Sequence, residues 1–265
     1  MRFFAQIGEH LFRLIRYLGE LALLAGEVFE SMVKGRKRWS QFLRQVVEIG
    51  YRSQPVVIIT GAFTGAVLAA QALFQFRMVG METMAGGLVS AAMLRELGPT
   101  ITGLMLAGRV GSSMAAEIGT MKVTEQIDAL RSMAVHPIDF LVTPRVMAMI
   151  VSIPLLLAQS VVCGIVASYL VGVPLFHVEE AIWWENVRKF ATLDDVKVAL
   201  IKGSVFGFLI VIISCHQGLR ASNGAVGVGR GTTNAMVYSS LAILVANFLL
   251  SMLMQMLFPL GLVNI

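Results

Sequence analysis

The chain has 265 residues, of which 57% are hydrophobic and 14% are charged, and its mean hydropathy is +0.77. Soluble domains are about 45–50% apolar and about 25% charged, so this composition excludes an ordinary soluble domain and predicts an integral membrane protein. The net charge of +5 does not indicate nucleic-acid binding, because the basic residues cluster beside apolar segments as they do in cytoplasmic loops of membrane proteins.

Residues 1–33 are predicted to form an amphipathic helix that lies in the membrane interface. Basic residues occupy its polar side, which is typical of interfacial helices. An ordinary core-facing helix is the alternative, but little soluble protein is present for it to pack on. The apolar face comprises Phe3, Phe4, Ile7, Leu11, Leu14, Ile15 and Leu18, and the polar face Arg2, Gln6, Glu9, Arg13, Arg16 and Glu20. The basic run Lys34, Arg36, Lys37 and Arg38 follows, with Trp39 as an interfacial anchor.

Five apolar segments after residue 48 are predicted to cross the membrane: 55–76, 85–119, 138–176, 199–215 and 234–257. The first has no charged residue and is long enough to span ~30 Å of hydrocarbon. Its Gly61-xxx-Gly65 pattern predicts close packing against another helix. Segment 138–176 contains Pro144 and Pro154 and is long enough to be tilted, broken or re-entrant, so a sixth span stays open.

The connecting segments differ in character. Residues 177–197 are polar and contain Trp183 and Trp184. Residues 216–233 are glycine-rich, and GAVGVGRG (224–231) is expected to be a flexible loop rather than a nucleotide site, because it lacks the Lys-Ser/Thr ending of a phosphate-binding loop. The two cysteines, Cys163 and Cys215, lie inside apolar runs and are expected to be packing residues rather than a disulfide. No cleavable signal layout is found at the N-terminus.

The distribution of Lys and Arg predicts the orientation. Nine basic residues precede the first span, whereas the segments expected outside hold four: Arg77, Arg188, Lys189 and Lys197. This bias places the N-terminus and residues 120–137 in the cytoplasm, and the tryptophan segment and the C-terminus outside. Three further basic residues, Arg95, Arg109 and Lys202, fall in or at the membrane.

The charges inside segment 85–119 are candidate functional residues, because ionisable groups within a span are costly and are usually paired or functional. Arg95-Glu96 precedes Gly98-Pro99, so the pair either serves a function or lies near water at the outer end of a kinked helix. Glu96 is expected to hold Arg95 of its own chain or of a second copy of the chain. Arg109 and Glu117 are ~12 Å apart along one helix and are expected to be satisfied by neighbouring helices.

Residues 121–137, MKVTEQIDALRSMAVHP, are predicted to form a short amphipathic cytoplasmic helix. Thr124 is the expected N-cap, Ile127, Leu130 and Ala134 the apolar face, and Pro137 the end. A surface helix resting on lipid headgroups is the alternative, but Glu125 and Asp128 gain nothing from an anionic leaflet. The pattern therefore favours a helix that docks into a groove on a soluble partner.

No motif in the sequence indicates an enzyme. GxxxxGK[ST] is absent, so the chain has no phosphate-binding loop of its own. The four histidines, His10, His136, His177 and His216, are scattered and show no metal-ligand spacing.

Three long stretches resemble one family. MLRELGPTITGLMLAGRVGSSMAAEIGTMKVTEQIDAL (93–130), MAVHPIDFLVTPRVMAMIVSIPLL (133–156) and GVGRGTTNAMVYSSLAIL (227–244) are similar to the permease subunit of MCE-associated lipid ABC transporters, the MlaE/YrbE family. The likeness extends along nearly the whole chain. It implies an all-α polytopic membrane protein with one permease domain over residues 1–265, divided into an interfacial helix region (1–48) and a transmembrane core (49–265).

The resemblance also implies partners and sites. The expected assembly is a homodimer in the bacterial inner membrane with cytoplasmic ATPase subunits, which bind the ATP and Mg²⁺, and a periplasmic MCE-domain lipid-binding hexamer. The expected role is intermembrane phospholipid transport that maintains outer-membrane lipid asymmetry. Expected ATPase contacts are Glu125, Gln126, Ile127, Asp128 and Leu130. The expected lipid cavity is lined by Leu68, Phe76, Val79, Arg95, Glu96 and Leu97.

Two other classes of function are open at this point. A stand-alone channel or secondary transporter could use Arg95, Glu96, Arg109 and Glu117 as an ion path, although no inverted repeat is seen. A membrane scaffold without transport would leave the charges inside the spans unexplained. The sequence does not give the direction of transport or distinguish phospholipid from sterol.

Overall fold

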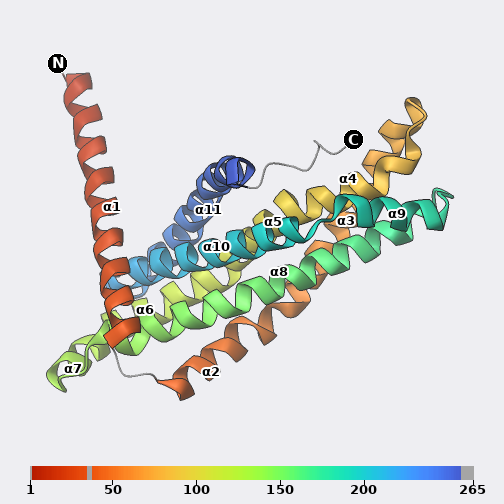
Figure 1. Cartoon of the computed structure of the whole chain (residues 1–265). Helices are drawn as coiled ribbons and strands as arrows, with labels where there is room; N and C mark the ends of the chain where they lie inside the picture. The colour runs from red at the N-terminus through yellow and green to blue at the C-terminus, as the bar shows by residue number, and fades with distance from the viewer. Residues whose placement is uncertain (1, 35–37, 258–265) are drawn as a thin grey trace.

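Helices make up the regular structure of residues 2–34 and 38–257, the part of the chain that this computed structural model describes (Figure 1). The side chains of residues 2–7, 10, 11 and 14, and the basic residues Arg36 and Lys37, lie outside the described part. The α-helices are α1 (Arg2–Lys34), α2 (Trp39–Ile49), α3 (Gln54–Met78), α4 (Ala85–Ala92), α5 (Gly98–Leu106), α6 (Ser112–Val123), α7 (Gln126–Ser132), α8 (Thr143–Gly172), α9 (Glu180–Phe190), α10 (Leu193–Leu219) and α11 (Gly224–Leu257). Short 3₁₀ turns are η1 (Tyr51–Ser53) and η2 (Glu82–Met84), and π-helical turns are η3 (Met93–Leu97), η4 (Ala107–Gly111) and η5 (Ile138–Val142).

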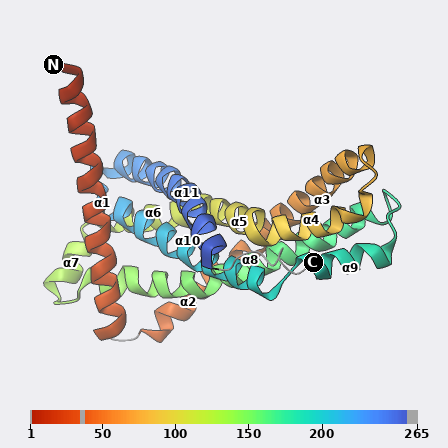
Figure 2. The same cartoon turned by 45° about the horizontal axis from the view of Figure 1, so that its top comes forward.

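Helices α8 and α10 extend along the molecule between α7 at one end and α9 at the other (Figures 1 and 2). Helix α1 lies at the α7 end and runs across that direction in both views. This is the placement expected of a helix in the membrane interface. Leu24 and Val28 are buried against the bundle, whereas Phe12, Leu23 and Phe29 are exposed, so α1 keeps apolar surface for the membrane.

A polar cluster fastens α1 to the end of α10. Glu20 lies 2.9 Å from Arg220 Nη1 and 3.2 Å from His216 Nε2. The hydroxyl of Tyr17 accepts a hydrogen bond from Gln217. Burial raises the pKa of the Glu20 carboxyl, but Arg220 and His216 outweigh it and hold that pKa below its usual value.

In the described residues, four helical stretches are long and apolar enough to cross a membrane: Trp39–Met78, Ile138–Gly172, Leu193–Leu219 and Gly224–Met256. They correspond to four of the five spans predicted from sequence. The remaining one, 85–119, is helical from Ala85 to Val123, with two π-helical turns where Arg95, Glu96 and Arg109 interrupt its apolar pattern.

The Gly61-xxx-Gly65 pattern packs as predicted, and its partner is α8. A Cβ atom at Gly65 would lie 2.1 Å from the carbonyl oxygen of Gly164, and one at Gly61 would lie 2.5 Å from that of Ser160. Because the obstacle at both positions is backbone, the two helices approach closely only where both sides carry small residues. Helices α3 and α8 form the most extensive helix–helix interface in the described residues.

Two connecting segments are more ordered than the sequence indicated. The tryptophan segment forms α9, which packs on α4; Trp183 is fully buried where Gly86 and Gly172 leave room for its ring. The expectation of a flexible loop over 216–233 is wrong. Helix α10 continues to Leu219, and α11 begins at Gly224, so GAVGVGRG forms the first turns of a helix. Packing of these turns on α6 and α10 overrides the low helix propensity of glycine.

Candidate functional site

The charged pair Arg95-Glu96 lies in the π-helical turn η3, just before Pro99. Proline has no N–H group, so the carbonyl of Arg95, four residues earlier, cannot accept its ordinary helical hydrogen bond. The N–H of Gly98 bonds instead to Met93 O, five residues back. The sequence thus widens the helix here and leaves one backbone acceptor for another partner, and such π-helical turns are frequent at functional sites.

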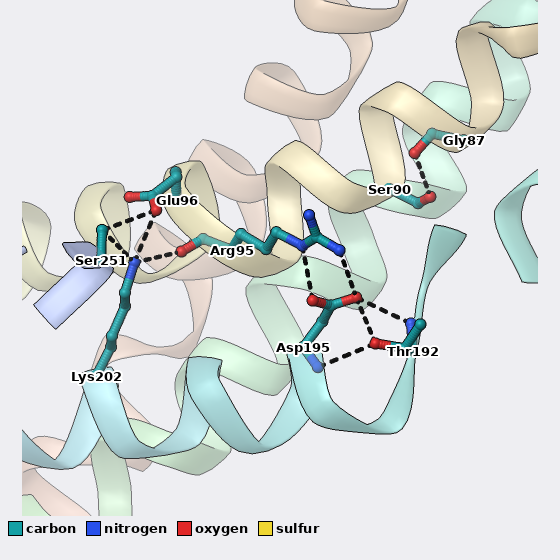
Figure 3. Close-up of polar contacts among 8 residues, drawn as sticks. All are labelled: Gly87, Ser90, Arg95, Glu96, Thr192, Asp195, Lys202 and Ser251. Atoms are coloured by element: carbon teal, nitrogen blue, oxygen red, sulfur yellow. Dashed lines mark hydrogen bonds and ion pairs between the residues drawn. The ribbon is translucent and has the colours of Figure 1, made fainter. Parts of the chain in front are cut away.

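Lys202 of α10 supplies that partner (Figure 3). Its ammonium donates to Arg95 O at 2.7 Å, to Glu96 Oε1 at 2.9 Å and to Ser251 Oγ at 2.8 Å. An ammonium has three donors, so all three are used. The Lys202 side chain is only 1% exposed, whereas that of Glu96 is 45% exposed, so the pair joins a buried cation to an accessible carboxylate.

Glu96 is also held by α11. Asn247 Nδ2 and Ser251 Oγ both donate to its carboxylate at 2.8 Å. Within this chain Glu96 therefore pairs with Lys202, and the expectation that it holds Arg95 is wrong for the intrachain contact. The turn η3, α10 and α11 meet at this one carboxylate.

Arg95 points instead to the first turn of α10. Its Nε and Nη2 atoms donate to the two carboxylate oxygens of Asp195 at 2.6 Å and 3.3 Å (Figure 3). Asp195 is fixed in turn by a capping box with Thr192. No hydrogen bond is formed by Arg95 Nη1 within the described residues, and Figure 3 shows it directed away from Asp195. One donor of a half-buried guanidinium is thus left for a ligand.

The apolar residues expected around this pair lie in two settings. Leu68 and Phe76 of α3 and Leu97 of η3 pack against one apolar cluster, comprising Ala69, Ala72, Leu73, Ala85, Val89, Met93, Phe176, Val178, Trp183 and Val187. Val79, at the end of α3, is 65% exposed. Three of the four apolar residues therefore border the same cluster, and Val79 is not among the residues packed against it.

Sequence reasoning noted Lys202 as a basic residue in or at the membrane but did not assign it, Asp195, Asn247 or Ser251 to this site. Lys202 was detectable as a charge in an apolar run, and the Thr192-x-x-Asp195 spacing as a capping box. No local pattern in the sequence indicated that Asp195 pairs with Arg95 or that Lys202 pairs with Glu96, about a hundred residues earlier.

The two other charges of segment 85–119 are satisfied by neighbouring helical segments, as predicted. Arg109 donates to the hydroxyl of Ser53. Glu117 lies 2.8 Å from Arg145 Nη2 of α8. The side chains of Arg95, Glu96, Arg109 and Glu117 thus contact different partners and not one another, which does not favour an ion path through them.

The predicted cytoplasmic helix is α7, but its ends differ from the prediction. Thr124 does not cap it; its hydroxyl donates back to Thr120 O, and Glu125, in the left-handed region, occupies the N-cap position. The helix ends at Ser132 rather than near Pro137. Val135 N–H bonds to Leu130 O and Ala134 N–H to Arg131 O, the Schellman pattern, with Ala134 left-handed.

The residues expected to contact a partner divide between two faces of α7. Glu125, Gln126 and Asp128 are exposed, whereas Ile127 is fully buried and Leu130 packs against the core. Ile127 and Leu130 therefore hold α7 on its own bundle, and the exposed face is polar apart from Ala129 and Met133. A cavity of about 510 Å³ borders α7 on the side of α1 and is lined in part by Glu27, Arg131 and Leu219.

Comparison with known proteins gives sequence matches along most of the chain. The family described as Permease MlaE matches residues 42–253. A protein named a probable ABC transporter permease, from Rickettsia typhi, is 42% identical over 94% of this chain and 96% of its own length. The intermembrane phospholipid transport system permease protein MlaE of Haemophilus influenzae is 31% identical over 96% of this chain and 98% of its own. The chloroplastic protein Trigalactosyldiacylglycerol 1 of Arabidopsis thaliana is 37% identical over 86% of this chain and 65% of its own.

Proposed function

This chain belongs to the MlaE permease family, and from that membership we propose that it is the membrane subunit of an ABC transporter that moves phospholipid between membranes. The observation that carries the proposal is its similarity, over 96% of its length, to a permease named for intermembrane phospholipid transport. In this proposal separate subunits bind ATP and Mg²⁺ and hydrolyse the ATP, and this chain acts as the permease subunit without an ATPase site.

The network at η3 supports a site for the phospholipid headgroup. Arg95 keeps one free donor, Nη1, and a planar guanidinium suits a phosphate. Lys202 neutralises Glu96, so the nearby carboxylate does not repel an anion. The apolar cluster bordered by Leu68, Phe76 and Leu97 supplies a wall for acyl chains. Residues 93–97 thus place a headgroup donor beside apolar surface.

The exposed face of α7 is the proposed contact with the ATPase. Glu125, Gln126 and Asp128 face outward at the end of the bundle opposite α9. Left-handed residues at both ends separate α7 from the neighbouring helical segments. A short helix of this kind at the end of the bundle suits a groove on a soluble partner. ATP-driven movement of that partner would be passed to the spans through α7 and would open or close the lipid site.

The remaining assembly follows from the same proposal. A second copy of the chain would cover α11, whose exposed residues include Leu241, Val245, Phe248 and Leu249. The α7 end would face the cytoplasm of a bacterial inner membrane, with the C-terminus in the periplasm. An MCE-domain hexamer at the α9 end would exchange lipid with the permease and so maintain outer-membrane lipid asymmetry.

The test is lipid retention by the assembled complex. The chain is expressed with its ATPase and purified in mild detergent, and bound lipid is identified by mass spectrometry. We expect wild type to retain phospholipid. The test variant combines Arg95→Ala with Asp195→Asn, so that no buried carboxylate is left unpaired. The apparent affinity of the complex for phospholipid should fall at least about ten-fold in this variant, because a hydrogen bond to a charged group contributes about 1.5–3 kcal/mol.

The matched control is Arg188→Ala, which removes an exposed arginine on α9. It should retain lipid as wild type does. Absence of both enriched phospholipid and co-purified ATPase in the wild-type preparation would contradict the proposed function.

A further inference from the structure

The two helical runs that flank α7 are joined behind it by a buried arginine. Arg145, in the first turn of α8, lies 2.8 Å through Nη2 from Glu117 Oε2 of α6. Glu117 precedes α7 in the chain and Arg145 follows it, so this ion pair closes the hairpin at whose tip α7 lies (Figure 1). No other ion pair within the described residues joins α6 to α8.

Arg145 is buried, whereas its partner Glu117 is exposed. Its side chain is 3% exposed, and that of Glu117 is 57% exposed. Within the described residues, the Nε and Nη1 atoms of Arg145 have no hydrogen-bond partner, and the guanidinium lies close to the thiol of Cys215 on α10. Glu117 is thus the one acidic group that pairs with Arg145 in that part of the chain, and loss of its carboxylate leaves a buried cation unpaired.

Helix α7 is bounded at both ends by residues at which the backbone leaves the helical conformation. Glu125 and Ala134, at its two ends, are in the left-handed region, with φ of 59° and 58°. A left-handed residue cannot continue a right-handed helix, so the chain changes direction at both positions. This conformation is costly for residues other than glycine. The exposed pairs of Asp128 with Lys122 and Arg131 lie at 3.2 Å and 3.3 Å and contribute little at a solvated surface.

Apolar packing holds the same unit together from within. Ile127 of α7 is fully buried in one cluster with Ile118 of α6 and with Val142 and Val146 at the start of α8. Packing of this kind is non-directional, so it resists separation of the helices better than it fixes their relative angle. The 2.8 Å ion pair of Glu117 with Arg145 adds to that packing one fixed point of attachment between α6 and α8.

We propose that Glu117 and Arg145 are positioning residues that make α6, α7 and α8 move as one piece. A displacement of α7 then reaches η3 through the helical run from Ala85 to Val123, because η3 lies within this run and carries Glu96, the partner of Lys202. The proposal rests on the function proposed above, because it assigns the path from the ATPase contact to the lipid site. Neither residue touches lipid or nucleotide.

The test compares lipid transfer with ATP hydrolysis in the assembled complex reconstituted in vesicles. In Glu117→Gln we expect the complex to assemble and hydrolyse ATP. The lipid transferred per ATP should fall at least about five-fold, the lower end of typical coupling between sites. Glu117→Asp, which keeps the charge, should give an intermediate ratio. Glu117→Gln with Arg145→Gln should be no worse than Glu117→Gln alone, because the two residues act as a pair.

The matched control is Glu30→Gln, which breaks an exposed ion pair with Lys34 at the same end of the molecule, 3.0 Å long in the structure. It should leave the ratio of lipid to ATP unchanged. An unchanged ratio in Glu117→Gln overturns the proposal. Parallel losses of transfer, hydrolysis and assembled complex in both Glu117 variants also overturn it, since they indicate a structural role alone.

A second measurement separates this proposal from the proposed function. Nitroxide labels are placed on α7 and on the turn before α11 through Ala129→Cys and Ser222→Cys, both at exposed positions. The distance distribution should be narrow with Glu117 present and broader in Glu117→Gln. If that broadening occurs but the wild-type complex transfers no lipid, the proposed function fails while the ion pair keeps its positioning role. An identical distribution in both chains contradicts the positioning role.

Discussion

At the scale of single residues, one proline accounts for much of the candidate site. Pro99 removes an N–H that Arg95 O would otherwise accept, and Lys202 then donates to that carbonyl at 2.7 Å. The same ammonium neutralises Glu96, which explains how a carboxylate persists inside an apolar region. The lysine therefore satisfies a backbone group and a side chain together.

Lys202→Met should destabilise the protein, because Glu96 loses its cation while Asn247 and Ser251 remain its only donors. Breaking a buried pair costs about 3–5 kcal/mol, and we expect the lower end of that range because Glu96 is 45% exposed. Adding Glu96→Gln should recover part of the loss. Thermal unfolding in detergent measures both variants, and a double variant less stable than Lys202→Met would argue against the pairing.

At the scale of helices, small residues decide where two spans can meet. Gly61 and Gly65 of α3 face Ser160 and Gly164 of α8 so closely that backbone touches backbone. The sequence pattern predicted a close contact but gave no partner, because small-residue patterns are common in membrane helices. The structure identifies α8 as that partner.

Gly65→Ala should lower stability by about 1–3 kcal/mol, the usual cost of overpacking, because the new methyl group would lie 2.1 Å from the Gly164 carbonyl oxygen. Gly26→Ala is the control. Nothing lies within 4 Å of a Cβ at Gly26 in α1, so this change should be neutral or slightly stabilising. The thermal midpoint in detergent compares them, and equal effects at both positions would contradict the tight α3–α8 interface.

At the scale of the whole molecule, the fold separates two working ends. Helix α7 and the interfacial helix α1 lie at one end, and α9 lies at the other. The η3 network, which includes Asp195 in the first turn of α10, belongs to the half of the bundle toward α9. Any signal from α7 to this network therefore has to travel along the helices.

This arrangement, with the bias of basic residues toward the α7 end, predicts which end faces the cytoplasm. Ala129→Cys on α7 should react with a membrane-impermeant thiol reagent only after bacterial cells are permeabilised. Glu185→Cys on α9 should react in cells whose outer membrane alone is opened. The chain with its native Cys163 and Cys215 gives the background, and the reverse pattern of labelling would invert the proposed orientation.

The sequence by itself determined the class of protein, the positions of its apolar helices and the amphipathic character of α1 and α7, because these follow from local composition and periodicity. It also marked Arg95, Glu96, Arg109 and Glu117 as charges that need partners. Only the tertiary structure decided which partners they have. Asp195 and Lys202 lie about a hundred residues from the groups they bind, and packing brings them together without any local signal. Packing likewise made the glycine-rich stretch the start of α11, where local propensity predicted a loop.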